Sequence, residues 1–287
     1  MLAVFSKELR AYFTSAIGYI FIGTFLLITG IFFTMYNLLA SSPAYNYTLQ
    51  SLITIFLFII PILTMKIMSE ETKTKTDQLL FTSPLKIIDI ILGKYLAALS
   101  IFTISLLITV LYPIILSMFG AISVSEILTG YIGIFLLGAT LIAIGLFVSS
   151  LTENQVTSAV ISFGILLFIF LIDGMQKALP STRNSSIVFV LIMLAIFSLY
   201  VYFSTKNMYA AAVSVVVGLI LIITIYLAKK EAYDGLLQKV FGWFSLIKRY
   251  TLFSQGVLSL NSVVYYLSFI AAFIFLTIRM VDKRRWS

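Results

Sequence analysis

The sequence predicts an all-α integral membrane protein, a bundle of about eight transmembrane helices, and three observations support this fold class. Hydrophobic residues make up 61% of the 287 residues and charged residues only 10%, whereas soluble domains carry about 25% charged residues. The apolar residues are grouped in runs of about 20, which is the length of a helix that spans a bilayer. These runs do not alternate between apolar and polar residues, as the strands of a membrane β-barrel do.

Eight apolar segments are long enough to cross a membrane. They cover residues 17–39, 49–68, 93–119, 126–150, 156–175, 186–203, 208–228 and 260–280. Polar residues, including Lys206 and Asn207, separate the sixth segment from the seventh. One long kinked segment over 186–228 is the alternative, but it would place both side chains at mid-bilayer, where polar groups are costly. We therefore expect two spans there.

Composition also limits the chemistry. The chain has no cysteine and no histidine, which excludes disulfides, thiolate chemistry, Cys/His metal sites and histidine acid–base catalysis. The net charge of +8 reports membrane topology in such a protein, so we expect membrane lipids and no nucleic acid among its partners. Residues 1–287 are predicted to form a single transmembrane domain.

The positive charges predict that both termini are cytoplasmic. With the N-terminus inside, the inner segments hold Lys7, Arg10, Lys66, Lys73, Lys75, Lys86, Lys94, Lys206, Arg279, Lys283, Arg284 and Arg285. The short outer loops hold only Lys177 and Arg183. Residues 229–259 fall outside although they carry five basic residues, and long external segments follow the rule less strictly.

Two segments outside the spans are amphipathic. In residues 1–16, Phe5, Leu9, Tyr12 and Phe13 share one helical face, which predicts a helix lying on the inner leaflet. In the external segment 229–259, apolar residues recur at steps of three and four. These residues are Leu236, Val240, Trp243, Phe244 and Ile247. An interfacial helix and a helix packed on other spans both remain open for this segment.

Residues 69–92 form a cytoplasmic excursion in which charged and apolar residues are mixed. Glu70, Glu71 and Asp77 precede the apolar pair Leu79 and Leu80, and Pro84 follows. Because proline interrupts helices, the pattern predicts a short helix, a turn and a second helix that leads into the third span. A solvated loop would not need the leucines, so we expect lipid headgroups or another protein to cover them.

This excursion carries a family resemblance. "EETKTKTDQLLFTSPLKIIDIILGKY" from Glu70 resembles the signature of type-2 ABC exporter permeases, most of all the subgroup of gliding-motility and nitrous-oxide-accessory permeases. Three further blocks are similar: "KELRAYFTSAIGYIFIGTFLLITGIFF" from Lys7, "GLFVSSLTENQVTSAVISF" from Gly145 and "LNSVVYYLSFIAAFIFLTIRMVDKRRW" up to Trp286. One departure is Lys75, where the family usually has glycine.

The resemblance implies six core spans plus an extra pair, in a bacterial plasma membrane. It also implies a transport subunit for efflux, paired with a second copy or a similar permease and driven by two copies of a cassette ATPase that binds Mg-ATP. In this family the excursion is a coupling helix that contacts the ATPase. The residues that match its contact motif, with two from the loop 149–155, are Glu70, Glu71, Thr76, Asp77, Leu79, Leu80, Thr82, Pro84, Glu153 and Asn154. A plain helix-connecting turn is the alternative for 149–155.

No Gly-x-x-x-x-Gly-Lys-Ser/Thr sequence occurs in the chain, so ATP binding by a P-loop is expected in another polypeptide. A membrane-embedded lipid-modifying enzyme is one competing class, but it needs clustered carboxylates, histidines or metal ligands. A secondary carrier is another, but we see no acidic relay at mid-membrane. The pattern suits an apolar or aromatic path, although aromatic residues also serve as packing.

Overall fold

The computed structural model describes residues 1–76 and 85–285, and these residues form helices joined by short loops without any strand. The chain divides into two compact units. The first comprises Met1–Ile169 and Leu246–Ser287, and the second comprises Phe170–Ser245. Helix α9 (Gln155–Ala178) passes from the first unit into the second.

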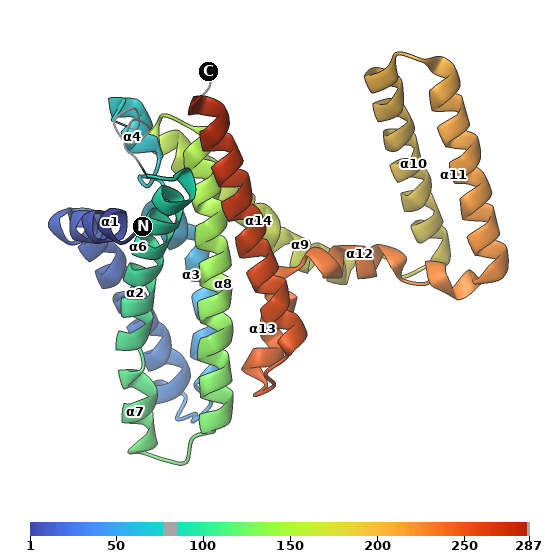
Figure 1. Ribbon diagram of the computed structural model, residues 1–287. Coiled ribbons are helices and arrows are strands. Elements are labelled where there is room, and N and C mark those ends of the chain that lie inside the picture. Colours follow the sequence, from blue (N-terminus) through green and yellow to red (C-terminus); the bar gives the residue numbers. More distant parts are fainter. Residues whose placement is uncertain (77–84, 286–287) are drawn as a thin grey trace. The chain divides into compact units, whose positions relative to one another are not determined.

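Besides α9, the first unit contains ten helical elements in its described residues. They are α1 (Leu2–Thr14), α2 (Ala16–Phe33) with the π-helix η1 (Thr34–Leu39), α3 (Asn46–Thr64), α4 (Ser69–Thr74), α6 (Ile87–Ile108), α7 (Leu111–Ser117), α8 (Val124–Leu151), α13 (Leu246–Ser254) and α14 (Leu260–Arg285). Short α1 lies across the end of α2, while α2, α3, α6 and α8 run alongside one another (Figure 1).

Helix α8 is the centre of this bundle and packs against α3, α6, α13 and α14. Small residues let its neighbours approach closely. A Cβ atom at Gly138 would lie 2.4 Å from the ring of Phe102, and one at Gly145 would lie 2.3 Å from Thr64 Oγ1. Phe102 in turn contacts the rings of Phe25 and Phe56, and all three are fully buried. The bundle is therefore held by aromatic packing around one tightly contacted helix.

The expected all-α membrane fold is confirmed, because eight helices in the described residues are long and apolar enough to cross a membrane. Their ends differ from the sequence-based limits by a few residues. The third span begins earlier, at Ile87, and its helix is interrupted after Ile108 before α7 starts. Pro113 explains the interruption, since it has no N–H to bond the carbonyl of Thr109.

The second unit contains an apolar helical hairpin, α10 (Arg183–Thr205) and α11 (Met208–Ala228), whose helices pack on each other. The chain reverses at Lys206, which has a left-handed backbone (φ 51°), and the two helices lie side by side (Figure 1). The prediction of two separate helices over 186–228 is thus confirmed, and the alternative of one long kinked segment is wrong.

A short polar node closes the open end of this hairpin. The 3₁₀ turn η2 (Lys230–Tyr233) and helix α12 (Leu236–Phe244) follow α11. Arg183 Nε and Nη2 donate to Asp234 Oδ1 and Oδ2, each at 2.9 Å, and Tyr233 donates to the carbonyl of Ile222 at 3.0 Å. The paired Arg183 guanidinium lowers the pKa of the Asp234 carboxyl.

The segment 229–259 is divided between two helices rather than forming one. The backbone is extended at Ser245, where α12 ends, and α13 then packs against α8 with Tyr250 and Phe253 fully buried. In α12, by contrast, Trp243 and Phe244 are 60% and 50% exposed. Of the two alternatives for this segment, a helix packed on other spans therefore describes α13. Helix α12 keeps the amphipathic pattern expected of an interfacial helix.

Candidate functional site

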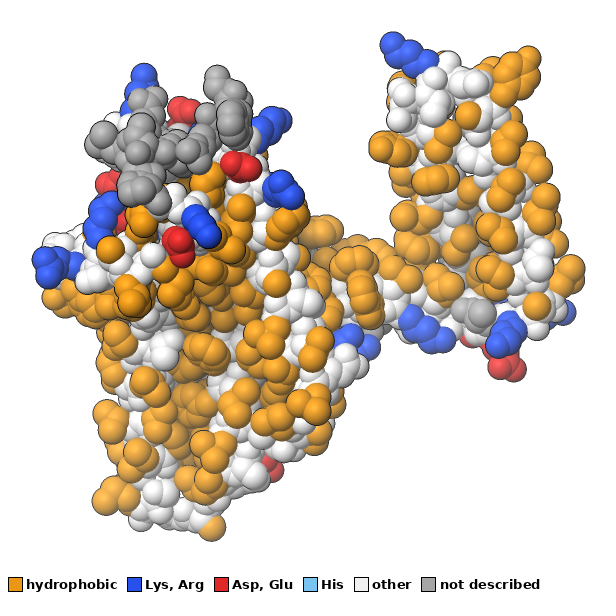
Figure 2. Space-filling view, in the orientation of Figure 1, with side chains coloured by type: hydrophobic (Ala, Val, Ile, Leu, Met, Phe, Trp, Pro, Cys, Tyr) orange, Lys and Arg blue, Asp and Glu red, His pale blue; other side chains and the backbone are white. Residues whose placement is uncertain are grey.

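Five chain segments that are distant in sequence meet at one end of the first unit. They are α1, α4, the start of α6, the end of α8 and the end of α14 (Figure 1). Charged side chains gather at this end on the visible face, and the flank of the unit is mostly hydrophobic (Figure 2). The N-terminal amino group also lies here, 3.9 Å from Asp89 Oδ1. We call this meeting point the junction.

Helix α4 is the first described part of the predicted coupling segment 69–92, and it has two different faces. Ser69 and Thr72 are buried, and the Glu71 side chain is 14% exposed. Lys73 and Thr74 are exposed. With only six residues, α4 is far shorter than the ~12–15 residues that an isolated helix needs to be even marginally stable in water. Contacts on its inner face must therefore hold it in place.

The first of these contacts is a buried ion cluster. The Lys94 side chain, on α6, is only 1% exposed, and its Nζ lies 2.9 Å from Glu71 Oε2 and 3.1 Å from Glu8 Oε1. It also donates to the carbonyl of Ile67 at 2.9 Å. The ammonium group thus has three oxygen partners, as a buried cation requires. One side chain thereby joins α1, α4, α6 and the chain between α3 and α4.

Lys7 extends this cluster to the surface. Its Nζ lies 3.3 Å from Glu71 Oε1 and 3.5 Å from Glu8 Oε1. Partial burial lowers the pKa of the Lys7 ammonium, but the carboxylates of Glu71 and Glu8 outweigh this effect and raise the pKa above its usual value. Two ammonium groups therefore face two carboxylates, and the cluster is neutral.

The end of α8 supplies the second set of contacts to α4. Ser149 Oγ accepts the backbone N–H groups of Met68 and Ser69 at 3.0 and 3.2 Å. Since the first N–H groups of a helix have no partner within it, this hydroxyl acts as a cap supplied by another helix. Arg284, on α14, donates to Thr72 Oγ1 and to the Ser150 carbonyl, both at 2.9 Å.

The position that departs from the family pattern, Lys75, ends α4 in a left-handed conformation (φ 56°). Its N–H donates to the carbonyl of Thr72, and the N–H of Thr76 donates to that of Glu71. This hydrogen-bond pattern with a left-handed residue is the Schellman motif, which favours glycine. The glycine usual in the family thus has a structural reason, and Lys75 adopts the same turn at a conformational cost.

The structure places only some of the predicted contact residues. Glu70 pairs with Lys66 at 3.2 Å and is half-exposed, Glu71 points inward to Lys94, and Thr76 is exposed. Asp77, Leu79, Leu80, Thr82 and Pro84 lie outside the described residues. The second predicted contact, Glu153 and Asn154, is exposed, and Asn154 Oδ1 accepts the N–H of Val156 at the start of α9.

Sequence reasoning missed the partners of Glu71. Lys94 counted only as one of the cytoplasmic positive charges, and Glu8 was not assigned a role. A signal was present, because Glu8 shares a helical face with Val4 and Tyr12 at four-residue spacing. The structure buries that face against α6, with Val4 5% and Tyr12 8% exposed. A carboxylate on a buried stripe requires a cationic partner.

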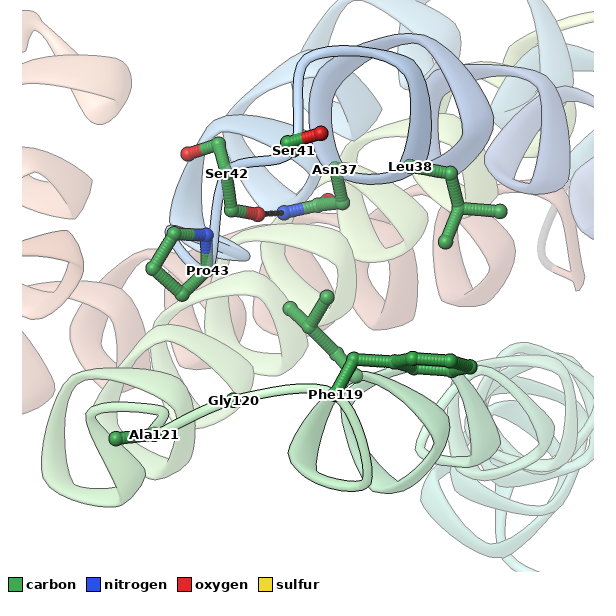
Figure 3. A pocket seen from close by; sticks show the side chains of 9 residues that line it. Asn37, Leu38, Ser41, Ser42, Pro43, Phe119, Gly120 and Ala121 are labelled. Atoms are coloured by element: carbon green, nitrogen blue, oxygen red, sulfur yellow. Dashed lines mark hydrogen bonds between the residues drawn. The ribbon is translucent and has the colours of Figure 1, made fainter.

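A pocket of about 510 Å³ lies at the opposite end of the first unit. Its lining residues are Asn37, Leu38, Ser41, Ser42, Pro43, Leu116, Phe119, Gly120 and Ala121 (Figure 3). The Asn37 amide donates to the carbonyl of Ser42 at 2.9 Å and accepts from Thr48 Oγ1 at 2.7 Å. The amide is therefore used to hold the loop after η1, and the pocket wall is mainly apolar.

The fold and the junction together define a multi-pass membrane protein with an organised polar end. The family described as ABC-2 family transporter protein matches residues 35–185, just over half of the chain, and includes α4 and the loop after α8. The chain therefore belongs to this family and is a membrane permease subunit of an ABC transporter. The family provides the transport subunit rather than a catalytic one. A search of curated proteins found no match.

Proposed function

We propose that this permease is driven by a separate cassette ATPase that docks on the outer face of α4 and on the segment after it. The observation that carries the proposal is the two-faced α4. Its inner face is tied to four other helices through Glu71, Thr72 and the Ser149 cap, and its outer face exposes Lys73 and Thr74. A helix held on one side and free on the other can receive a partner without losing its own support.

The junction suggests how movement passes into the membrane domain. A displacement of α4 acts on Glu71, and the buried contact with Lys94 carries it to α6. The same ammonium group holds Glu8, so α1 moves with them. Buried charged contacts suit this task, because separating them leaves an uncompensated charge in a low-dielectric setting. The three segments therefore move as one body when the ATPase changes shape.

The functional unit is proposed to hold two permeases, identical or similar, and two ATPase subunits, which bind Mg-ATP. This complex would export its substrate across the plasma membrane. We also propose that the chain belongs to the subgroup of gliding-motility and nitrous-oxide-accessory permeases. A mass measurement of the detergent-purified complex tests the composition. A stable complex of one permease and one ATPase would contradict it.

The docking proposal is tested by replacing Leu79 and Leu80 with aspartate. Burying each leucine against the partner contributes about 1.5–3 kcal/mol, and carboxylates in a dry contact add a further penalty. The double variant is expected to insert normally, to lose the ATPase on purification and to lose stimulated ATP hydrolysis. Lys86→Asp, which adds a carboxylate nearby but keeps both leucines, is the control and should retain the ATPase. Intact assembly and hydrolysis in the double variant would refute the proposed contact.

A further inference from the structure

We propose that Arg284, near the C-terminal end of α14, is a positioning residue that fixes α4 relative to the end of α8. The inference rests on the proposed function, in which two segments contact the ATPase. One is the coupling segment 69–92, which begins with α4, and the other is the loop 149–155 at the end of α8. The C-terminal helix is thereby part of the coupling machinery, a role that neither the family motif nor the sequence pattern gave it.

The geometry is that of a bridge with two different acceptors. Arg284 Nη1 donates to Thr72 Oγ1 and Nη2 donates to the Ser150 carbonyl, each at 2.9 Å. Thr72 is 8% exposed and Ser150 is fully buried. The planar guanidinium offers its two nitrogens in a fixed fork, so one side chain sets the spacing between the inner face of α4 and the last turn of α8.

At both ends of the bridge, Arg284 donates to an acceptor that has a lone pair available. Ser150 lies in the final turn of α8, which ends at Leu151, and the last four carbonyls of a helix have no partner within it. A positive charge there also complements the helix dipole. Thr72 Oγ1 donates to the carbonyl of Met68 at 3.1 Å, so its lone pairs remain available to Arg284. The bridge therefore satisfies the hydrogen bonding of both helices.

The bridge complements the Ser149 cap on the same helix. Ser149 Oγ holds the N–H groups of Met68 and Ser69, which fixes where α4 begins. Arg284 holds Thr72, one turn later. On the side of α8, these two attachment points fix both the position and the direction of the six-residue helix, and without Arg284 only the Ser149 cap and the Glu71–Lys94 contact to α6 would hold it. Losing Arg284 should therefore tilt α4 without releasing it.

The test uses spin labels, because the chain has no cysteine of its own. Labels attached to Lys73→Cys and Glu153→Cys, both exposed positions, report the distance between α4 and the loop after α8 in the purified permease without any ATPase. The parent is expected to give one narrow distance distribution. Arg284→Gln and Thr72→Val should both broaden it, and Arg279→Ala, a second arginine of α14 that lies over the Phe275 ring, should leave it unchanged.

Arg284→Lys separates a bridge from a simple charge effect. Lysine keeps the charge near the end of α8 but lacks the planar fork, so the distribution should stay broad, and recovery of the narrow distribution would overturn the bridge. A second measurement uses the complex with the ATPase. Arg284→Gln should retain the bound ATPase but lower stimulated hydrolysis about tenfold, in line with the loss of a charged hydrogen bond.

The spin-label distances and the ATPase measurements distinguish a failure of the Arg284 bridge from a failure of the proposed function. If the distances broaden as expected but no ATPase binds the parent chain, then the proposed function fails and the bridge stands. If the ATPase binds and Arg284→Gln changes neither the distances nor the hydrolysis, then Arg284 is not a positioning residue and the proposed function stands. Broadened distances with full hydrolysis would also overturn the coupling role.

Discussion

The Lys94 ammonium lies 2.9 Å from the Glu71 carboxylate, and the Lys94 side chain is 1% exposed. This pair joins the first turns of the third span to the short helix that follows the second span. Burying an ion pair costs desolvation energy that the attraction repays only when the geometry is good and other hydrogen bonds are made. Glu8 and the Ile67 carbonyl supply those bonds. The pair therefore defines a specific arrangement of α1, α4 and α6.

The first prediction concerns Lys94→Met. Methionine fills a similar volume but leaves Glu8 and Glu71 without their buried cation. Breaking a buried pair in this way costs about 3–5 kcal/mol. The variant should have a markedly lower melting temperature in detergent, measured by circular dichroism, and α1 should become more accessible to protease.

A matched variant tests the cause. Adding Glu8→Gln and Glu71→Gln to Lys94→Met removes the unpaired charges while keeping the side-chain shapes. Replacing a whole buried ionic group is often nearly neutral, so the triple variant should regain most of the lost stability. If it is no more stable than Lys94→Met alone, the ion pairs are not the reason for the loss.

The second prediction concerns Lys75→Gly. Lys75 has a positive φ of 56°, which costs a residue with a Cβ atom about 1–2 kcal/mol and costs glycine little. Glycine should therefore stabilise the end of α4. Hydrogen exchange of the backbone amides of residues 69–76 should slow several-fold, in line with a gain of about 1 kcal/mol. Lys75→Ala, which removes the lysine but keeps a Cβ atom, is the control and should exchange like the parent. Faster exchange in Lys75→Gly would contradict the turn assignment.

The spans could be predicted from the sequence because each depends on local composition. A run of apolar residues long enough to cross a bilayer has few alternatives to a helix. The polar residues Lys206 and Asn207 likewise marked the hairpin turn that the structure confirms. The break between α12 and α13 could not be read in the same way, because the apolar spacing continues through Ser245, where the backbone becomes extended.

The junction could be predicted only in part, because it is built from pairs that are distant in the chain. Glu70 and Glu71 were singled out together by the family motif, yet the structure turns them in different directions. Glu70 reaches Lys66 on the surface and Glu71 reaches Lys94 inside. Which of two adjacent carboxylates is buried depends on how α4 sits on α6 and α8. A single sequence gives no information on that packing.

The third prediction concerns the pH dependence of the second unit. The Arg183 pairing lowers the pKa of Asp234, so this carboxylate stabilises the fold above its unfolded-state pKa of about 3.9. The contribution is lost as pH falls through the lowered folded-state pKa. Asp234→Asn should reproduce that loss at neutral pH. With Trp286→Phe as background, Trp243 fluorescence reports the unit, and its melting temperature should fall in the variant.

The control for this experiment is Glu231→Gln, an exposed carboxyl on η2. It should leave the Trp243 transition unchanged. In the parent, acidification below about pH 4 should lower the transition, whereas in Asp234→Asn the same acidification should lower it less. Equal responses of parent and variant to acid would show that the pair contributes nothing.

The last prediction concerns topology and the α10–α11 hairpin. Both termini are predicted to be cytoplasmic, and with eight spans this topology would place the hairpin turn at Lys206 inside the cell and the base near Glu231 outside. The base carries more positive charge than the turn, which runs against the usual rule. Two of these charges are engaged, however, since Arg183 pairs with Asp234 and Lys230 lies 5.6 Å from the centre of the Tyr226 ring.

Single cysteines decide this topology, because the chain has none of its own. In intact cells, a maleimide that cannot cross the membrane should label Glu231→Cys and, as the external control, Ser123→Cys in the loop before α8. It should label Lys206→Cys and the internal control Thr74→Cys only after the cells are opened. Labelling of Lys206→Cys and Glu231→Cys from the same side would mean that the hairpin does not cross the membrane. The chain would then have six spans, and an even number would still leave both termini on one side.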